Sequence, residues 1–218
     1  MNLVSVATAP DDLGQPAKPP LLTFLEEAYA RYRDDFSGAV ANYIPELSKA
    51  DPAKFGVAVA TIDGHVYEVG DSAFPFTIQS VSKAFVFGLA LELLGADHVE
   101  SFVGVEPSGE AFNSIRLNAK NQPFNPMVNA GAIATTSLVP GADADAKWRF
   151  LHEGLSAFPG RTLPMNVEVL ESARQTNHRN RALASFLRSV GAIHSEPMEA
   201  VDLYTMQCSL DVTARDLA

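Results

Sequence analysis

The alternation of side chains between residues 55 and 70, followed by an apolar helix, limits the folds that this chain can adopt. Residues 57–62 and 66–69 alternate with a period of two around Asp63-Gly64, a dipeptide typical of a hairpin turn. From Ser80 to Leu94 the chain is apolar almost all round, which predicts a helix buried between layers and ended by Gly95. We therefore predict two antiparallel strands that lead directly into a buried helix.

Helical patterns account for most of the remaining sequence. Apolar residues from Leu21 to Tyr32 recur at helical spacing, and Ser37-Gly38 is expected to end that helix. A later helix is expected to have Ser195 as its N-cap, and the segment from Thr213 to Asp216 is similar to a capping box. Further helices are predicted over residues 142–157, 167–173 and 180–190, the last two joined by a polar connection at residues 175–179.

These elements predict an α/β plus α-helical fold in four successive parts. Two strands alone make no stable layer, so we expect further strands beyond Ala218 or from another chain. The parts are a mobile tail over residues 1–20, the N-terminal part of an α/β domain over 21–79, a helical domain over 80–208, and a return to the α/β domain over 209–218, which we expect to be truncated.

Composition and charge exclude several classes of protein. The net charge of −10 argues against binding to nucleic acid or to an anionic membrane surface. No apolar segment reaches the roughly 20 residues that span a bilayer, and the N-terminus does not resemble a signal peptide. The single cysteine, Cys208, suits a reducing compartment, so we expect a cytoplasmic protein.

Sequence motifs for metals and cofactors are absent. The five histidines are scattered without metal-ligand spacing, and Cys208 has no cysteine partner. The chain contains neither a P-loop nor a glycine-rich dinucleotide motif, and no serine lies in a G-x-S-x-G elbow. We therefore expect neither a metal nor a cofactor.

Ser80 and Lys83 form an S-x-x-K pair at the start of the apolar helix. Residues three apart lie on one helical face, so hydroxyl and amine can meet, while Ser82 points away. A lysine can take a proton from serine only if desolvation lowers its pKa. The motif alone also fits a helix start with a solvated lysine. We expect the pair to be crowded by apolar neighbours, namely Phe76, Ile78, Phe85 and Phe87.

Asn129 stands out in the segment from Met127 to Thr136, which is otherwise apolar and poor in large side chains. Small side chains allow another backbone to approach closely. A buried amide needs hydrogen-bonding partners, so Asn129 either satisfies a neighbouring turn or faces a polar ligand. Tyr43 precedes a proline-stiffened turn and on its own fits a half-buried aromatic residue.

With these residues the chain resembles the serine-dependent glutaminases, relatives of the β-lactamases and penicillin-binding proteins that hydrolyse glutamine to glutamate and ammonia. The resemblance covers most of the chain from Pro20 onward. Its segments, in family order, are Asn42–Leu47, Phe76–Lys83, Glu106–Gly109, Asn125–Ala132, Arg179-Asn180, Asp202–Tyr204 and Cys208–Thr213.

The resemblance implies roles for particular residues. It makes Ser80 the nucleophile and Lys83 its base, within a β-lactamase-like sheet that has flanking helices and a helical domain. It also implies glutamine as the substrate and a homodimer or homotetramer as the assembly. The residues that would bind the substrate are Tyr43, Ser80, Asn129, Asn180 and Tyr204.

Two departures from the family pattern affect these expectations. Family members usually carry a glutamate seven residues before the position of Asn180, where it binds the substrate's α-amino group, and this chain has Ala173 there. Glu171 is a poor substitute because two residues rotate a helical side chain by about 200°. A later tyrosine and a lysine-containing strand would fall beyond Ala218. We therefore expect the chain from residue 1 to 218 to be poorly active.

Two other functions remain open from the sequence. A penicillin-recognising serine hydrolase shares S-x-x-K, although no S-x-N or Y-x-N triplet lies at a suitable spacing. The second is a catalytically inactive scaffold whose buried small-residue helix and acidic surface serve only oligomerisation. Ala173 and the family segments that would fall beyond Ala218 keep this alternative open.

Overall fold

The computed structural model describes residues 18–218, so the mobile tail predicted for residues 1–20 lies almost entirely outside the described part. The described chain divides into two compact units. The first contains residues up to Val40, Asp51–Pro75 and Thr213–Ala218, and the second contains Ala41–Ala50 and Phe76–Val212. None of the helices among residues 18–218 is long and apolar enough to cross a membrane.

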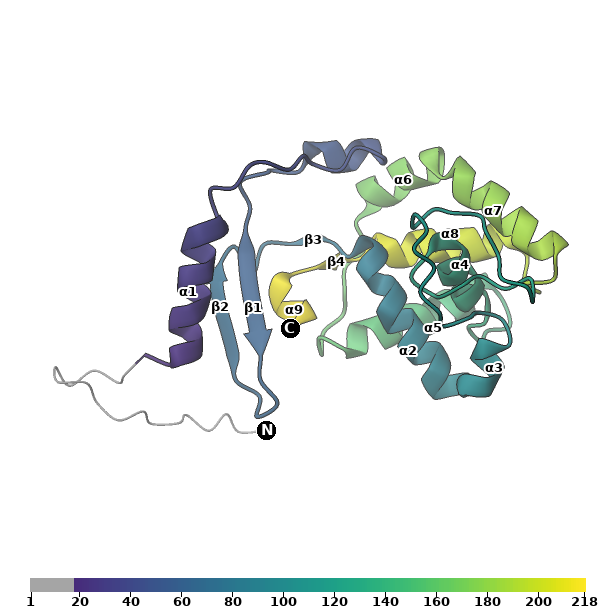
Figure 1. Ribbon diagram of the computed structural model, residues 1–218, viewed down its shortest axis with the longest axis horizontal. Coiled ribbons are helices and arrows are strands. Elements are labelled where there is room, and N and C mark those ends of the chain that lie inside the picture. The colour runs from purple at the N-terminus through teal and green to yellow at the C-terminus, as the bar shows by residue number, and fades with distance from the viewer. Residues whose placement is uncertain (1–17) are drawn as a thin grey trace. The chain divides into compact units, whose positions relative to one another are not determined.

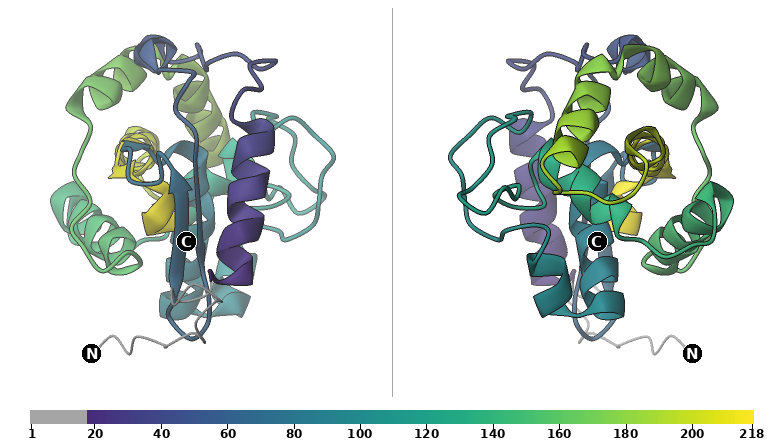
Figure 2. Two further views of the ribbon diagram at one scale, coloured as in Figure 1. Left: turned by 90° about the vertical axis from the view of Figure 1, so that its left-hand side faces the viewer. Right: turned by 90° about the vertical axis from the view of Figure 1, so that its right-hand side faces the viewer.

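The first unit is built on the predicted hairpin. Strands β1 (Gly56–Ala60) and β2 (Val66–Gly70) pair antiparallel, and Gly64 takes a φ of 86° in the turn between them. Helix α1 (Pro20–Tyr32) lies beside the hairpin, in contact with both strands (Figure 1 and the left view of Figure 2). The hairpin prediction is confirmed, whereas α1 ends at Tyr32, several residues before the predicted end at Ser37-Gly38.

A short C-terminal helix belongs to the same unit. Helix α9 (Ala214–Leu217) begins with a capping box in which the Thr213 hydroxyl accepts from the Asp216 backbone N–H, and the Asp216 carboxylate accepts from the Thr213 N–H. This start confirms the capping box predicted from the sequence. The Arg215 backbone N–H donates to the Ser72 carbonyl at 3.3 Å, which fixes α9 beside the hairpin.

The second unit begins with a pair of very short strands. Strand β3 (Phe76–Thr77) pairs antiparallel with β4 (Asp211–Val212), and the Ile78 N–H donates to the Leu210 carbonyl at 2.8 Å. The hairpin therefore does not lead directly into the helix as predicted, because β3 intervenes. A strand of two residues is too short to show a period of two in the sequence.

Helix α4 (Asn129–Ser137) lies at the centre of the second unit, in contact with α2 (Ser82–Leu94), α7 (His178–Ser189) and α8 (Pro197–Cys208) (Figure 1). A Cβ added at Gly131 would lie 1.9 Å from the Asn125 carbonyl oxygen, so the small side chains do permit a close backbone approach. The surrounding elements are η1 (Pro45–Lys49), η2 (Gln79–Val81), α2 (Ser82–Leu94), α3 (Ala96–Glu100), α5 (Ala144–Ala157), α6 (Val167–Thr176), α7 (His178–Ser189) and α8 (Pro197–Cys208).

Three local predictions for these helices are wrong. The polar connection at residues 175–179 is mostly helical, since only Asn177 separates α6 from α7. Glu196, not Ser195, is the N-cap of α8, because Pro197 occupies the first turn and Glu196 has the extended backbone of a cap. Helix α2 is not buried all round: one side is covered, and the residues exposed on the other side include Ala84, Gly88 and Leu93.

Candidate active site

A pocket of about 530 Å³ lies within the second unit and is lined by every predicted site residue. Its lining comes mainly from η2, α2, α4, α6, α7 and α8, from the segment before η1, and from the segment between α3 and α4. The structure thus brings together residues that are far apart in the chain. The predicted site residues in this lining are Tyr43, Ser80, Lys83, Asn129, Asn180 and Tyr204.

Ser80 lies in the 3-10 turn η2, not on the α-helix itself, which begins at Ser82. The preceding residue, Gln79, has a φ of 47°, a left-handed conformation that is strained for a residue with a side chain. The Ser82 hydroxyl donates to the Gln79 carbonyl at 2.8 Å and so stabilises this turn. Ser82 points away from the pocket, as predicted, and its hydroxyl helps to position the residue before Ser80.

A series of hydrogen bonds between buried polar side chains supports this turn. Gln207 is fully buried in α8, and its amide nitrogen donates to the Ser82 hydroxyl at 3.2 Å. The Gln207 side-chain oxygen accepts a hydrogen bond from the Thr136 hydroxyl at 3.1 Å. These hydrogen bonds therefore connect α4, through Gln207 and Ser82, to the backbone of Gln79 beside Ser80. No pattern in the sequence pointed to Gln207.

Lys83 is buried, with 3% of its surface exposed. Its amine donates to the Met127 carbonyl at 2.8 Å and to the Asn129 side-chain oxygen at 2.8 Å. Burial lowers the pKa of Lys83 because it disfavours the ammonium form. Burial also raises the pKa of the neighbouring Cys208 thiol to about 11, so this thiol is neutral at pH 7. The environment of Lys83 therefore favours a neutral amine.

Asn129 connects the other polar side chains of the pocket. Its side-chain oxygen accepts from Lys83 and, at 3.4 Å, from the Tyr204 hydroxyl. Its amide nitrogen donates to the Asn180 side-chain oxygen at 3.1 Å. The alternative that the Asn129 side chain satisfies a neighbouring turn is therefore wrong. The side chains of three other pocket residues form its hydrogen bonds, and Asn129 also lines the pocket.

The two tyrosines occupy different environments. Tyr204 is buried, and burial raises its pKa well above the usual value, an effect that a hydrogen bond with Ser80 partly offsets. It is therefore a neutral hydrogen-bond donor at pH 7. Tyr43 is 60% exposed at the edge of the pocket. The segment after it is attached to α6, since the Glu46 N–H donates to the Ser172 hydroxyl at 3.3 Å.

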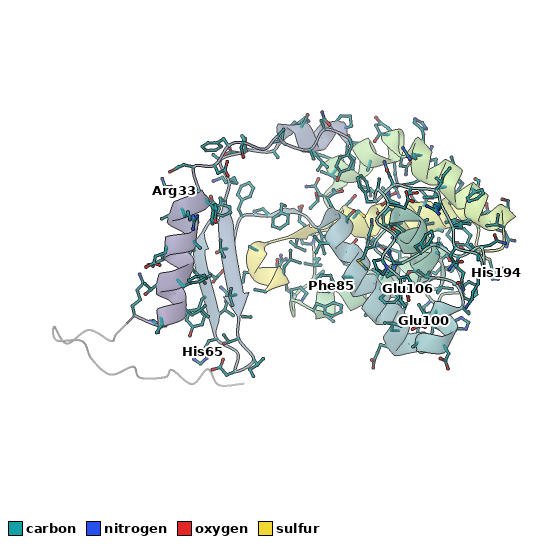
Figure 3. The ribbon with its side chains drawn as sticks, in the orientation of Figure 1. Arg33, His65, Phe85, Glu100, Glu106 and His194 are labelled. Atoms are coloured by element: carbon teal, nitrogen blue, oxygen red, sulfur yellow. The ribbon has the colours of Figure 1, made fainter. Side chains whose placement is uncertain are left out.

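The apolar neighbours predicted to crowd Ser80 and Lys83 do not line the pocket. Phe85 projects from α2 (Figure 3) and packs edge to face on Phe158, with ring centroids 4.8 Å apart. Phe76 is more than a third exposed. The hydrogen-bond partners of Lys83, by contrast, lie far along the sequence from the S-x-x-K motif.

The charges of the pocket are unbalanced. Among its described lining residues, Lys83 and Arg179 are the only basic side chains, and none is Asp or Glu. Arg179 is exposed and pairs with no carboxylate in the described part of the chain. Residues 18–218 also contain no cluster of His, Cys, Asp or Glu that could hold a metal ion. This arrangement can activate a serine and bind an anionic group, with no carboxylate to bind a cation.

Comparison with known proteins identifies relatives over most of the chain. Residues 38–218 match the family model described as Glutaminase. The chain is 53% identical over its whole length to Glutaminase 2 of Bradyrhizobium diazoefficiens, of which it covers 35%. It is 38% identical to the solved structure of Mglu in its L-glutamate binding form, with a TM-score of 0.87 over 93% of this chain and 46% of that chain.

A third relative carries a bound ligand. The structure of a probable glutaminase from Bacillus subtilis complexed with 6-diazo-5-oxo-L-norleucine is 34% identical, with a TM-score of 0.81 over 94% of this chain and 64% of that chain. The structural neighbours confirm the predicted α/β plus α-helical fold class of the penicillin-binding-like type. The chain spans about a third of the length of the Bradyrhizobium protein and less than two thirds of the other two.

Proposed function

The chain belongs to the glutaminase family, and from this we propose that its pocket hydrolyses a glutamine-type side-chain carboxamide to a carboxylate and ammonia. The observation that carries the proposal is the setting of Lys83, which is buried among neutral hydrogen-bond acceptors three residues from Ser80. A lysine in such a setting can serve as a general base near neutral pH.

The hydrogen bonds of Lys83 determine where its lone pair is free. A neutral amine has two N–H groups and one lone pair. The two N–H groups match the two acceptors, the Met127 carbonyl and the Asn129 side-chain oxygen. The lone pair is then left to accept the proton of the Ser80 hydroxyl, as nucleophilic catalysis by serine requires.

The proposed reaction proceeds through an acyl-enzyme. Ser80 Oγ attacks the carboxamide carbon while its proton passes to Lys83, which gives a tetrahedral oxyanion stabilised by backbone N–H groups such as that of Ser80. The Lys83 ammonium returns the proton to the leaving nitrogen, so that ammonia departs and a glutamyl ester remains on Ser80. Water then attacks this ester, with Lys83 again as the base, and releases the carboxylate and the free serine.

Neutral side chains provide the remaining contacts in the proposal. Tyr43, Asn129, Asn180 and Tyr204 can donate to and accept from an uncharged amide and a polar head group. We further propose that the enzyme needs no cofactor, is cytoplasmic and forms a homodimer or homotetramer. Its helical domain, residues 80–208, would lie between two α/β segments of the sequence.

Covalent labelling tests the nucleophile directly. The glutamine analogue 6-diazo-5-oxo-L-norleucine has an electrophilic carbon in place of the amide nitrogen, so a reactive serine bonds to it and dinitrogen leaves. We expect the purified chain to gain one adduct in its intact mass, located on Ser80 by peptide mapping. Ammonia release from glutamine should fall in Ser80→Ala by more than about a thousandfold relative to any rate that the unaltered chain shows.

Ser185→Ala is the matched control, since Ser185 is exposed on α7 and lies outside the pocket. It should label and react like the unaltered chain. Equal labelling or equal ammonia release in Ser80→Ala and the unaltered chain would contradict the proposed role of Ser80. Labelling of Ser80 by a β-lactam in preference to the glutamine analogue would favour a penicillin-recognising hydrolase.

A further inference from the structure

The charge of the pocket bears on which carboxamides it can bind. Its described lining residues supply two basic groups and no carboxylate. One of them, Lys83, is neutral in the proposed mechanism and already bonded to Met127 and Asn129. Arg179 is left as the permanent charge of the lining. The lining therefore offers a ligand one fixed positive charge and no carboxylate.

Two acidic residues close to the lining in sequence are directed elsewhere. Asp202, two residues before Tyr204, accepts two hydrogen bonds of 2.7 Å from Arg174. Glu171, two residues before Ala173, is exposed and outside the pocket lining. Neither carboxylate lines the pocket in the described structure.

An α-amino acid carries an ammonium group next to its carboxylate. An ammonium that leaves water needs an anionic or strong acceptor partner, because otherwise its desolvation is uncompensated. Here it would also be repelled by Arg179, while a carboxylate would be attracted. An uncharged group in place of the ammonium avoids both costs. The pocket thus suits the acid and amide ends of a glutamine-like molecule better than its amino group.

Residue 173 is a position in the lining that has a small side chain and could hold a larger, charged one. Ala173 of α6 is 5% exposed and lines the pocket with only a methyl group. It lies one residue after Ser172, whose hydroxyl accepts from the Glu46 N–H and joins α6 to the segment that carries Tyr43. A longer side chain at residue 173 would therefore extend from the same lining to which Tyr43 belongs.

We propose that this pocket selects ω-carboxamides of dicarboxylic acids that carry no ammonium group, either because the α-nitrogen is absent or because it is acylated. Ala173 is the specificity-determining residue, since it leaves the position uncharged and open. This inference rests on the proposed amide hydrolysis and specifies its substrate class. It makes glutamine itself a poor substrate relative to its uncharged analogues.

A substrate panel tests the inference on the unaltered chain. Ammonia release is measured for L-glutamine, N-acetyl-L-glutamine and glutaramate, the monoamide of glutaric acid. We expect kcat/KM for glutaramate or N-acetyl-L-glutamine to exceed that for glutamine by about tenfold to a hundredfold, the factor expected for one charged group left without its partner. Calorimetry with the corresponding acids, L-glutamate, N-acetyl-L-glutamate and glutarate, should give the same order of affinity.

Substitutions at residue 173 separate charge from size. Ala173→Glu supplies the missing anion and should shift the preference toward glutamine by about tenfold or more. Ala173→Gln has the same size without the charge and should not. Gln175→Glu adds the same charge at an exposed position of α6 outside the pocket, so it should leave the ratio of substrates unchanged. Circular dichroism establishes that each variant is folded.

The outcomes distinguish this inference from the proposed function. If glutamine is the best substrate and Ala173→Glu and Ala173→Gln behave alike, the inference is wrong while amide hydrolysis stands. If none of the three amides releases ammonia, the proposed function fails for this chain, and calorimetry alone decides the inference. In that case, affinity for L-glutamate equal to or above that for glutarate and N-acetyl-L-glutamate would overturn it.

Discussion

Replacement of Gln207 by leucine should destabilise the second unit and slow the reaction of Ser80. Gln207 is fully buried and bonds to the hydroxyls of Ser82 and Thr136 at 3.2 and 3.1 Å. Leucine has a similar volume, so the substitution removes the two hydrogen bonds without creating a large cavity. The Thr136 hydroxyl then loses the acceptor to which it donates, while Ser82 keeps the Gln79 carbonyl.

The magnitude follows from these contacts. Each lost hydrogen bond contributes about 0.5–1.5 kcal/mol, and a buried hydroxyl left without an acceptor costs about 1–3 kcal/mol. We expect the free energy of unfolding to fall by roughly 2–4 kcal/mol. The same series of hydrogen bonds supports the left-handed backbone of Gln79, a conformation that costs about 1–3 kcal/mol. Labelling of Ser80 by the diazoketone should therefore also become slower.

Urea denaturation followed by tryptophan fluorescence measures the effect in the relevant unit. Trp148 is the single tryptophan and lies in α5 of the second unit. Gln175→Leu is the control, since Gln175 is exposed on α6 and should change stability by no more than about 0.5 kcal/mol. A loss below about 0.5 kcal/mol in Gln207→Leu, with unchanged labelling of Ser80, would refute the role assigned to this chain of hydrogen bonds.

Three further predictions concern Lys83, the close backbone approach at α4 and the buried thiol. Burial lowers the pKa of Lys83 in the folded chain from its usual 10.5. Between the folded and the unfolded pKa the unfolded chain binds more protons, so the free energy of unfolding should rise with pH in that range. Lys83→Met should abolish both this rise and the labelling of Ser80. Gly131→Ala should destabilise by about 3 kcal/mol or more, because its Cβ would lie 1.9 Å from the Asn125 carbonyl oxygen. The Cys208 thiol has a pKa of about 11, and the residue is only 9% exposed. It should therefore react slowly with iodoacetamide at pH 8 until urea unfolds the chain.

Each of these has a clear contrary result. If the free energy of unfolding changes with pH in the same way for Lys83→Met and the unaltered chain between pH 7 and 10, the lowered pKa of Lys83 is contradicted. Gly88→Ala is the control for α4, since no described atom outside its own helix lies within 4 Å of its Cβ position, and alanine there should stabilise by about 0.5–1 kcal/mol. Rapid alkylation of the folded chain would show that Cys208 is more accessible than the structure indicates.

Features that depend on a few neighbouring residues could be predicted from the sequence. Asp63-Gly64 predicted the hairpin because glycine adopts the positive φ that the turn requires. Gly95 ends α2 with a φ of 78°, and Thr213 caps α9, as their local preferences indicated. Strands β3 and β4 were missed because each has two residues and a partner far along the chain.

The candidate site was predictable only in part. The spacing of Ser80 and Lys83 indicated a possible catalytic pair, but Asn180 and Tyr204 entered only through the resemblance to a family. The aromatic neighbours expected around the pair pack elsewhere, as Phe85 does on Phe158. Hydrophobic neighbours in sequence are poor indicators of desolvation, because the side chains that cover a residue come from any element that packs on it.

The sequence by itself determined the hairpin, the main helices, the nucleophile candidate and the excess of acidic residues, since these depend on residue type and short spacing. Only the tertiary structure decided that Lys83 lies between Met127 and Asn129, that Gln207 supports the turn before Ser80, and that no described carboxylate lines the pocket. The reason is physical: burial, partner geometry and the local field depend on which distant segments meet, and these interactions in turn determine a pKa and the charge that a ligand can carry.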